Sequence, residues 1–174
     1  MRIIAGSRKG ARIFAPKGLD TRPTGDRARE AAFNLIGPVD GAHVLDLFAG
    51  SGAMGLEALS RGAEDVVFVE ADREACRTID HNLEKLRLHA RVLCHDVARF
   101  LAAEPGTYNL VFCDPPYDQV ARIRDRLARH LPKLLTPQGL LVLETSSREP
   151  EPDLSLPLRT SRRYGAARIT LFEL

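Results

Sequence analysis

From His43 onward, short apolar segments alternate with segments of helical periodicity, and this alternation limits the folds open to the chain. Five segments are typical of strands, and helical segments separate most of them: HVLDLFA, DVVFVE, ARVLCH, YNLVFC and GLLVLE. Parallel strands need such long crossover connections, whereas antiparallel strands can be joined by short turns. The pattern therefore predicts an α/β protein whose mostly parallel sheet is covered by helices on both faces.

The two ends of the chain depart from this alternation. Near the C-terminus, the run from Leu158 to Tyr164 and the run ARITLFE flank a glycine with no helix between them, so one of these strands should run antiparallel. At the start, RIIAG and ARIFAP flank a basic turn, which predicts a hairpin with Arg8 and Lys9 at its tip. We therefore expect a hairpin extension with a basic loop over residues 1–23 and a main domain over residues 24–174.

Length and composition exclude several classes of protein. A chain of 174 residues with 44% apolar residues can form one domain with a core, which excludes a disordered chain. Its apolar runs, such as Leu140 to Leu143, are far shorter than the roughly 20 residues of a membrane span. Three scattered cysteines without a CxxC pair, and a start without an apolar leader, predict a cytoplasmic protein. The histidines lack metal-ligand spacing, so we predict no metal site.

The charge is distributed unevenly along the chain. Residues 1–30 carry eight basic and three acidic residues, although the whole chain has a net charge of only +2. A basic N-terminal stretch on a mildly acidic body favours a polyanionic partner such as nucleic acid. A solvated loop rich in arginine gives the same pattern. The size of the chain and the lack of an extra apolar face favour a monomer.

A glycine-rich segment follows the first strand and opens a helix. Gly50-Ser51-Gly52-Ala53-Met54-Gly55 matches G-x-G-x-x-G, and Glu70 lies 20 residues after its first glycine. This context is typical of a loop that binds a nucleotide or nucleoside closely. Asp46 stands four residues before the loop, where its carboxylate would repel a pyrophosphate but attract an ammonium and a sulfonium. S-adenosylmethionine carries both cations and no phosphate.

Two further carboxylates follow strands of the predicted sheet. Glu70 ends the second strand, where it can accept hydrogen bonds from both ribose hydroxyls of an adenosine. Asp96 ends the third strand, where it could pair with an adenine amino group. An N-cap for the helix that starts at Val97 is an equally good role for Asp96, and the two roles are compatible.

The sequence Asp114-Pro115-Pro116-Tyr117 follows the apolar strand YNLVFC. The two prolines hold the chain extended and fix one carboxylate and one aromatic ring at the carboxyl edge of the sheet. Asp114 and the carbonyl of Pro115 can accept the two N–H groups of an exocyclic amine, and Tyr117 offers a face on which a flipped base can stack. This chemistry predicts methyl transfer to an exocyclic nitrogen of a nucleobase.

Together these segments resemble a known family. The segments VLDLFAGSGAMGLEALSRGA, FVE and DPPY resemble class I methyltransferases that act on amino groups of nucleic acids. RIIAGSRKGARI and TRPTGDRAREAAFN resemble, more specifically, the RsmD family of bacterial enzymes that methylate guanine N2 in 16S ribosomal RNA. The resemblance implies a seven-stranded Rossmann-like methyltransferase fold with an N-terminal β-hairpin. It also implies S-adenosylmethionine as the donor, S-adenosylhomocysteine as the product, and rRNA in an assembling small subunit as the acceptor.

The resemblance also implies roles for individual residues. The donor-binding residues would be Asp46, Phe48, Gly50 and Gly52 at the methionine, Glu70 at the ribose, and Asp96 with Val97 at the adenine. The catalytic residues, which hold the guanine, would be Asp114, Pro115, Pro116 and Tyr117. The residues that bind the RNA substrate would be Arg8, Lys9, Arg12, Arg22, Thr24 and Arg27. Gly25 stands where the family usually has a second threonine, which touches no catalytic position.

Three other functions remain open from the residues alone. DPPY serves any exocyclic amine, so an adenine-N6 methyltransferase of DNA or RNA is one alternative. A NAD-dependent oxidoreductase would use the same glycine loop, although Asp46 argues against it. A non-catalytic RNA-binding module would keep the fold without needing both Asp46 and Asp114.

Overall fold

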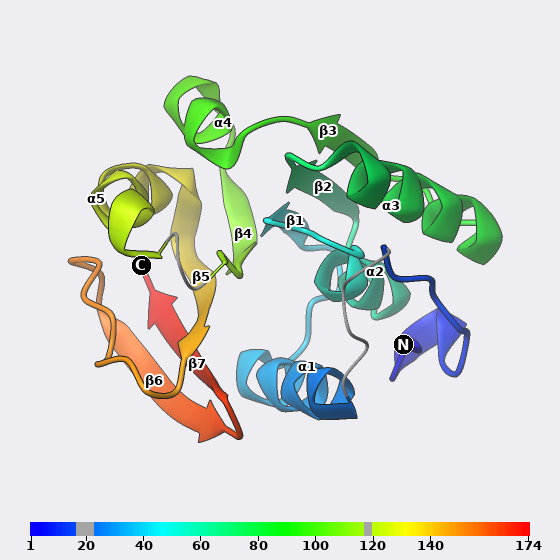
Figure 1. Ribbon diagram of the computed structural model, residues 1–174, viewed down its shortest axis with the longest axis horizontal. Helices are drawn as coiled ribbons and strands as arrows, with labels where there is room; N and C mark the ends of the chain where they lie inside the picture. Colours follow the sequence, from blue (N-terminus) through cyan, green and yellow to red (C-terminus); the bar gives the residue numbers. More distant parts are fainter. Residues whose placement is uncertain (17–22, 117–119) are drawn as a thin grey trace.

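The computed structural model describes residues 1–16, 23–116 and 120–174, and its centre is a seven-stranded sheet (Figure 1). The strands are β1 (His43–Leu47), β2 (Asp65–Glu70), β3 (Arg91–Cys94), β4 (Tyr108–Cys113), β5 (Leu135–Ser146), β6 (Leu158–Tyr164) and β7 (Ala167–Glu173). They lie in the order β3-β2-β1-β4-β5-β7-β6, in which β7 alone runs antiparallel to the others. The predicted mostly parallel sheet with an antiparallel C-terminal strand is confirmed.

Helices cover both faces of the sheet, as its buried parallel strands require (Figure 1). One face packs against α1 (Pro23–Ile36), α2 (Ala53–Ser60) and α3 (Arg73–Leu86). The other packs against α4 (Val97–Ala103), α5 (Val120–His130) and the 3-10 helix η2 (Leu131–Leu134). Alternate residues of β1 supply both cores, with Val44 on the α1 side and Leu45 on the α5 side. Among the described residues, no helix combines the length and apolarity needed to cross a membrane.

The N-terminal arm (residues 1–16) turns back on itself at the 3-10 helix η1 (Gly6–Arg8), with Lys9 directly after it. The predicted turn is therefore present. The predicted flanking strands are not, because the two legs of the arm meet in a single antiparallel bridge between Arg2 and Arg12. The arm is a hairpin held by a few bonds rather than a two-stranded ribbon.

Side chains of α2 and α3 bind backbone groups that a longer hairpin ladder would otherwise use. Glu57, which is 0% exposed, accepts hydrogen bonds from the amides of Ile4 and Ala5 at 2.7 and 2.9 Å. Asn82 accepts the amide of Phe14 at 2.8 Å and donates to the carbonyl of the same residue at 3.0 Å. Because buried backbone groups need partners, these bonds fix the arm to the two helices in addition to the few bonds between its own legs.

Gly6 brings the arm against α2 so closely that we expect Gly6→Ala to be strongly destabilising. Gly6 has φ +80°, and a Cβ there would lie 1.8 Å from the carbonyl oxygen of Ser60. Gly10 has φ +84° but nothing within 4 Å of a Cβ. Gly10→Ala therefore loses stability only through the strain of alanine in a left-handed conformation. In chemical denaturation, the free energy of unfolding of Gly6→Ala should be about 1–3 kcal/mol lower than that of Gly10→Ala. Equal stabilities would show that the arm does not pack on α2 as described.

Candidate functional site

A cavity of about 560 Å³ lies at the carboxyl ends of β1, β2, β4 and β5, beside α1. Its volume falls within the roughly 300–1,000 Å³ of small-molecule sites, and its position is where open α/β sheets bind ligands. Among the described residues, the charged side chains of its wall are four carboxylates and one guanidinium, namely Asp46, Glu70, Asp114, Glu144 and Arg29. An excess of negative charge in the wall favours a ligand that carries positive charge.

Asp46 on β1 occupies the amino end of α2. It is 3% exposed, and its Oδ2 accepts a hydrogen bond of 2.9 Å from the amide of Gly55. Burial raises the pKa of Asp46 to about 7, an effect that the Gly55 bond opposes and nearby Glu70 reinforces. A protein carboxylate therefore already satisfies the helix terminus at which a pyrophosphate would otherwise bind.

The glycine loop between β1 and α2 needs unusual backbone conformations. Gly50 and Gly52 have φ values of +55° and +76°, which glycine adopts without strain. Phe48 also has a positive φ of +58°, which is rare for a large side chain and marks a backbone held by its surroundings. The third glycine has a packing role, because a Cβ on Gly55 would lie 2.3 Å from the ring of Phe68. The loop thus brings its backbone to the cavity while α2 packs closely on β2.

Glu70 holds the other side of the loop from the end of β2. Its two carboxylate oxygens accept the amides of Gly50 at 2.8 Å and Asp72 at 2.9 Å. Each carboxylate oxygen has two lone pairs, so Glu70 can accept further hydrogen bonds from a ligand in the cavity. Glu70 is therefore both a loop anchor and an available acceptor.

Asp114, Pro115 and Pro116 follow β4 and form part of the same cavity wall. Asp114 exposes its side chain to the cavity, where surrounding protein limits its solvation. The pKa of Asp114 is raised well above its usual range. The largest cause is burial, and the charges of Glu144 and Asp46 add to it. A poorly solvated carboxylate is stabilised by a ligand that donates hydrogen bonds to it. Tyr117 lies outside the described residues.

The structure brings together most of the residues predicted to bind the donor and the base. The cavity wall contains Asp46, Phe48, Gly50, Glu70, Asp114, Pro115 and Pro116. Gly52 shapes the loop without lining the cavity. Asp96 is exposed and caps α4 by accepting the amide of Arg99 at 2.9 Å, which confirms its N-cap role, while Val97 is buried. Asp96 and Val97 lie outside the cavity wall, and their predicted contact with adenine remains a prediction.

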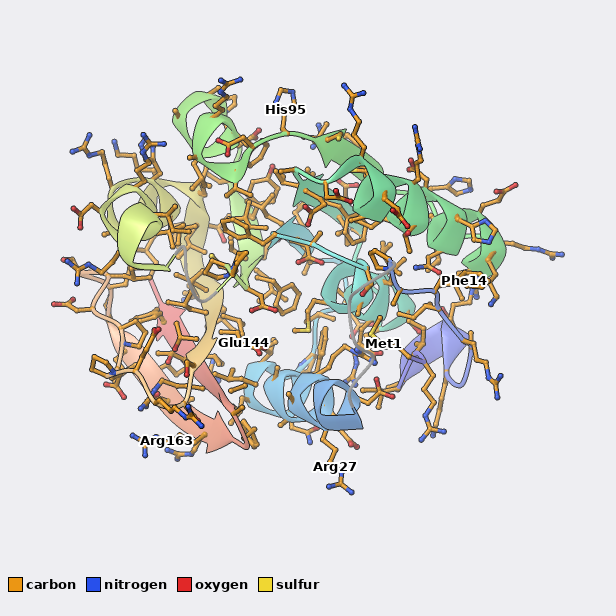
Figure 2. All side chains as sticks on the ribbon, in the orientation of Figure 1. Met1, Phe14, Arg27, His95, Glu144 and Arg163 are labelled. Atoms are coloured by element: carbon orange, nitrogen blue, oxygen red, sulfur yellow. The ribbon has the colours of Figure 1, made fainter. Side chains whose placement is uncertain are left out.

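The residues predicted to bind RNA are more dispersed. Arg8 donates from Nε to the carbonyl of Leu86 at the end of α3, at 2.7 Å, so its guanidinium also fastens the arm. Lys9 and Arg12 are exposed on the arm, and Arg27 is exposed on α1 and points away from the ribbon (Figure 2). Arg22 and the side chain of Thr24 lie outside the described part of the chain; the backbone of Thr24 is the second residue of α1.

Sequence reasoning missed Arg29 and Glu144. Arg29 is 4% exposed and donates to the carbonyl of Arg2 at 2.7 Å and to Asp26 at 3.0 Å, while also lining the cavity. Glu144 is half-buried on the stretch of β5 nearest α1 (Figure 2). The signal for Glu144 was present, because it ends the apolar run GLLVLE at the same sheet edge as the DPPY motif.

Within the described residues, no group of three or more His, Cys, Asp or Glu could hold a metal ion.

The sequence and the structure of this chain are similar to those of several known proteins. The model of the family described as conserved hypothetical protein 95 matches residues 1–173. YlbH of Bacillus subtilis is 48% identical over 126 residues, which cover 68% of each chain. Ribosomal RNA small subunit methyltransferase D of Escherichia coli K12 is 44% identical over 119 residues, covering 67% of this chain and 60% of that protein. A solved hypothetical protein of Thermus thermophilus is 33% identical, with a TM-score of 0.86 over 100% of this chain and 99% of its own.

Proposed function

Because the chain belongs to the family described as conserved hypothetical protein 95, the RsmD family, we propose that it methylates the N2 amine of a guanine in 16S ribosomal RNA. The observation that carries the proposal is the single cavity shared by Asp46, at the amino end of α2, and Asp114, after β4. One of these carboxylates suits a cationic donor and the other suits an amine acceptor. A methyl group can pass only between two ligands held in such direct proximity.

The β1–β2 side of the cavity fits S-adenosylmethionine. When bound, this cofactor supplies a methyl group made electrophilic by its sulfonium. Asp46 would attract the cationic methionine end, near Phe48 and the glycine loop, and Glu70 would accept the ribose hydroxyls. The fit rests on the wall itself, which has four carboxylates and a helix terminus already occupied by Asp46. Asp96 and Val97, beyond Glu70, would contact the adenine.

The β4–β5 side would hold the guanine. Asp114 and the Pro115 carbonyl would accept the two hydrogens of the exocyclic amine and aim its nitrogen at the donor, and Tyr117 would stack on the base. The lone pair of this amine is delocalised into the ring, and two acceptors favour its localisation on nitrogen. Asp114 need not be a strong base, because the amine proton becomes acidic only as nitrogen binds carbon. Alignment of this kind can supply roughly 7–11 kcal/mol of the barrier reduction.

Of the two enzymatic alternatives, the structure disfavours the oxidoreductase. A NAD-dependent oxidoreductase would place a pyrophosphate at the amino end of α2, where Asp46 binds Gly55. An adenine-N6 methyltransferase would use the same Asp114 chemistry, so only the chemical nature of the product separates it from the proposal. The curated relative named above acts, by its name, on small-subunit ribosomal RNA. We accordingly propose a cytoplasmic enzyme that acts as a monomer on rRNA within an assembling small subunit.

Transfer of tritiated methyl groups from S-adenosylmethionine tests the proposal directly. Unmethylated small ribosomal subunits, naked 16S rRNA, tRNA and duplex DNA are compared side by side, and the products are digested to nucleosides. N2-methylguanosine in the subunit or its rRNA is the expected product. N6-methyladenine would keep the Asp114 chemistry but overturn the proposed substrate, and binding of NAD without S-adenosylhomocysteine would overturn the proposed reaction class.

Exposed cations of the N-terminal arm should contribute to RNA affinity through phosphate contacts. We expect Lys9→Gln combined with Arg12→Gln to weaken rRNA binding and to reduce the slope of log affinity against log salt by about 1–2. Arg124→Gln with Arg126→Gln removes two exposed charges from α5 and serves as the matched control. Filter binding between 50 and 200 mM salt (roughly the range over which counterion release is measurable) gives the slopes. An unchanged slope in the arm variant would show that the arm does not meet phosphate.

A further inference from the structure

The strand register places a second carboxylate beside Asp114. Leu143 of β5 pairs with Cys113 of β4, so Glu144 and Asp114 each follow the last pair of the two neighbouring strands. Paired residues of adjacent strands project from the same face of the sheet, with the strands about 4.8 Å apart. Both side chains line the cavity, and the charge of Glu144 contributes to the raised pKa of Asp114. The acceptor side of the cavity thus presents two adjacent carboxylates.

The two carboxylates can accept hydrogen bonds but, when ionised, donate none. Burial raises the pKa of Glu144. Within the described residues, neither its carboxylate nor that of Asp114 accepts a hydrogen bond from another side chain or from the backbone. A ligand with two neighbouring donors would therefore satisfy both groups. Such a ligand would relieve the desolvation of two charges at once.

The Watson–Crick edges of the bases differ in this respect. Guanine presents its N1–H beside its 2-amino group, which gives two neighbouring donors. Adenine and cytosine present an exocyclic amine beside a ring nitrogen that has a lone pair and no hydrogen. With the amine at Asp114, the adjacent ring position faces Glu144, so guanine is attracted there and adenine or cytosine is repelled.

We propose that Glu144 selects guanine by accepting a hydrogen bond from N1–H while Asp114 accepts from the 2-amino group. This inference rests on the proposed function and names a specificity-determining residue for it. Ile169 pairs with Glu144 across β5 and β7 and lines the same cavity, so the base would meet an apolar wall beside its reading edge. A site built to bind a substrate N–H rejects an analogue that lacks it far more strongly than an apolar pocket does.

The test compares guanosine with 2-aminopurine riboside at the methylated position of an otherwise identical rRNA. The analogue keeps the 2-amino group, has a lone pair in place of the N1 hydrogen and lacks the 6-oxo group, so the change that Glu144→Gln makes to the preference, and not the wild-type preference alone, reports on N1. We expect the wild-type protein to methylate guanosine at least about 100-fold faster than the analogue. Glu144→Gln offers an amide that can donate to the bare ring nitrogen, so the preference for guanosine should shrink at least tenfold. Glu64→Gln, which removes an exposed carboxylate before β2, should keep the wild-type preference.

The possible outcomes separate the two proposals. If the wild type forms no N2-methylguanosine in rRNA, the proposed function itself is wrong. If N2-methylguanosine forms but Glu144→Gln slows both substrates by the same factor, Glu144 does not read N1 and the present inference is overturned. Affinity for S-adenosylhomocysteine, measured by calorimetry, should match the wild type in Glu144→Gln and so exclude a general loss of the folded site. If the ratio of the methylation rates of guanosine and 2-aminopurine riboside changes only in Glu144→Gln, the result supports base selection by this residue.

Discussion

Replacing Asp114 by alanine should lower methyl transfer by about 10²–10⁴-fold while leaving the affinity for S-adenosylhomocysteine within about threefold of wild type. The carboxylate faces the acceptor side of the cavity, and its removal takes away the charged acceptor of the amine hydrogens. Asp114→Asn keeps one acceptor oxygen at the same place and should lose less activity. Tritium transfer measures the rate, and calorimetric titration measures the affinity.

The stability of the Asp114 variants provides the control. Because burial and two neighbouring carboxylates raise the pKa of Asp114, ionising this side chain is less favourable in the folded protein than in the unfolded chain. Asp114→Ala should consequently be at least as stable as the wild type, so lost activity cannot come from unfolding. A parallel collapse of donor affinity would show that donor and base do not occupy separate sides of the cavity.

Replacing Asp46 by asparagine should weaken S-adenosylmethionine binding by at least tenfold at pH 8 and remove its pH dependence. The pKa of Asp46 is about 7 in the free protein, so a cationic donor must displace a proton when it binds below that pH. The dissociation constant of the wild type should then rise by up to about tenfold for each pH unit below 7 and level off above it. Titrations between pH 5 and 8.5 measure the dependence.

The same carboxylate should make stability fall with rising pH in the absence of donor. The folded protein binds the Asp46 proton more tightly than the unfolded chain does, so its contribution is fully present below about pH 4 and is lost as pH rises to about 7. The expected decline is up to about 1.4 kcal/mol per pH unit in this window. Asp46→Asn should lack this component of the decline. If the free energy of unfolding fell equally with pH in both proteins, Asp46 would lie in water rather than in the buried site.

Sequence periodicity was sufficient for the central strands of the sheet, because a strand buried on both faces is apolar along almost its whole length. It was sufficient for Asp46, Glu70 and Asp114 as well, since each is a charged residue at or near the end of such a strand. It was insufficient for the arm, whose hydrogen bonds go to Glu57 and Asn82. Those partners become neighbours only through the fold. Glu144 also ends an apolar run, but no motif accompanies it, and its place beside Asp114 depends on the register of β5 against β4.

The anchors of the N-terminal arm also set an order of assembly. Ile4 bonds to a residue 53 positions further along the chain, and Phe14 to one 68 positions further. The arm leaves the ribosome before α2 and α3, so its anchors Glu57 and Asn82 become available only once those helices have formed. Contacts between such distant residues carry a loop-closure cost that is repaid only when the later elements are in place. The arm is thus synthesised before the helices that anchor it and docks after them, and Met1 reaches the cavity wall only after that step.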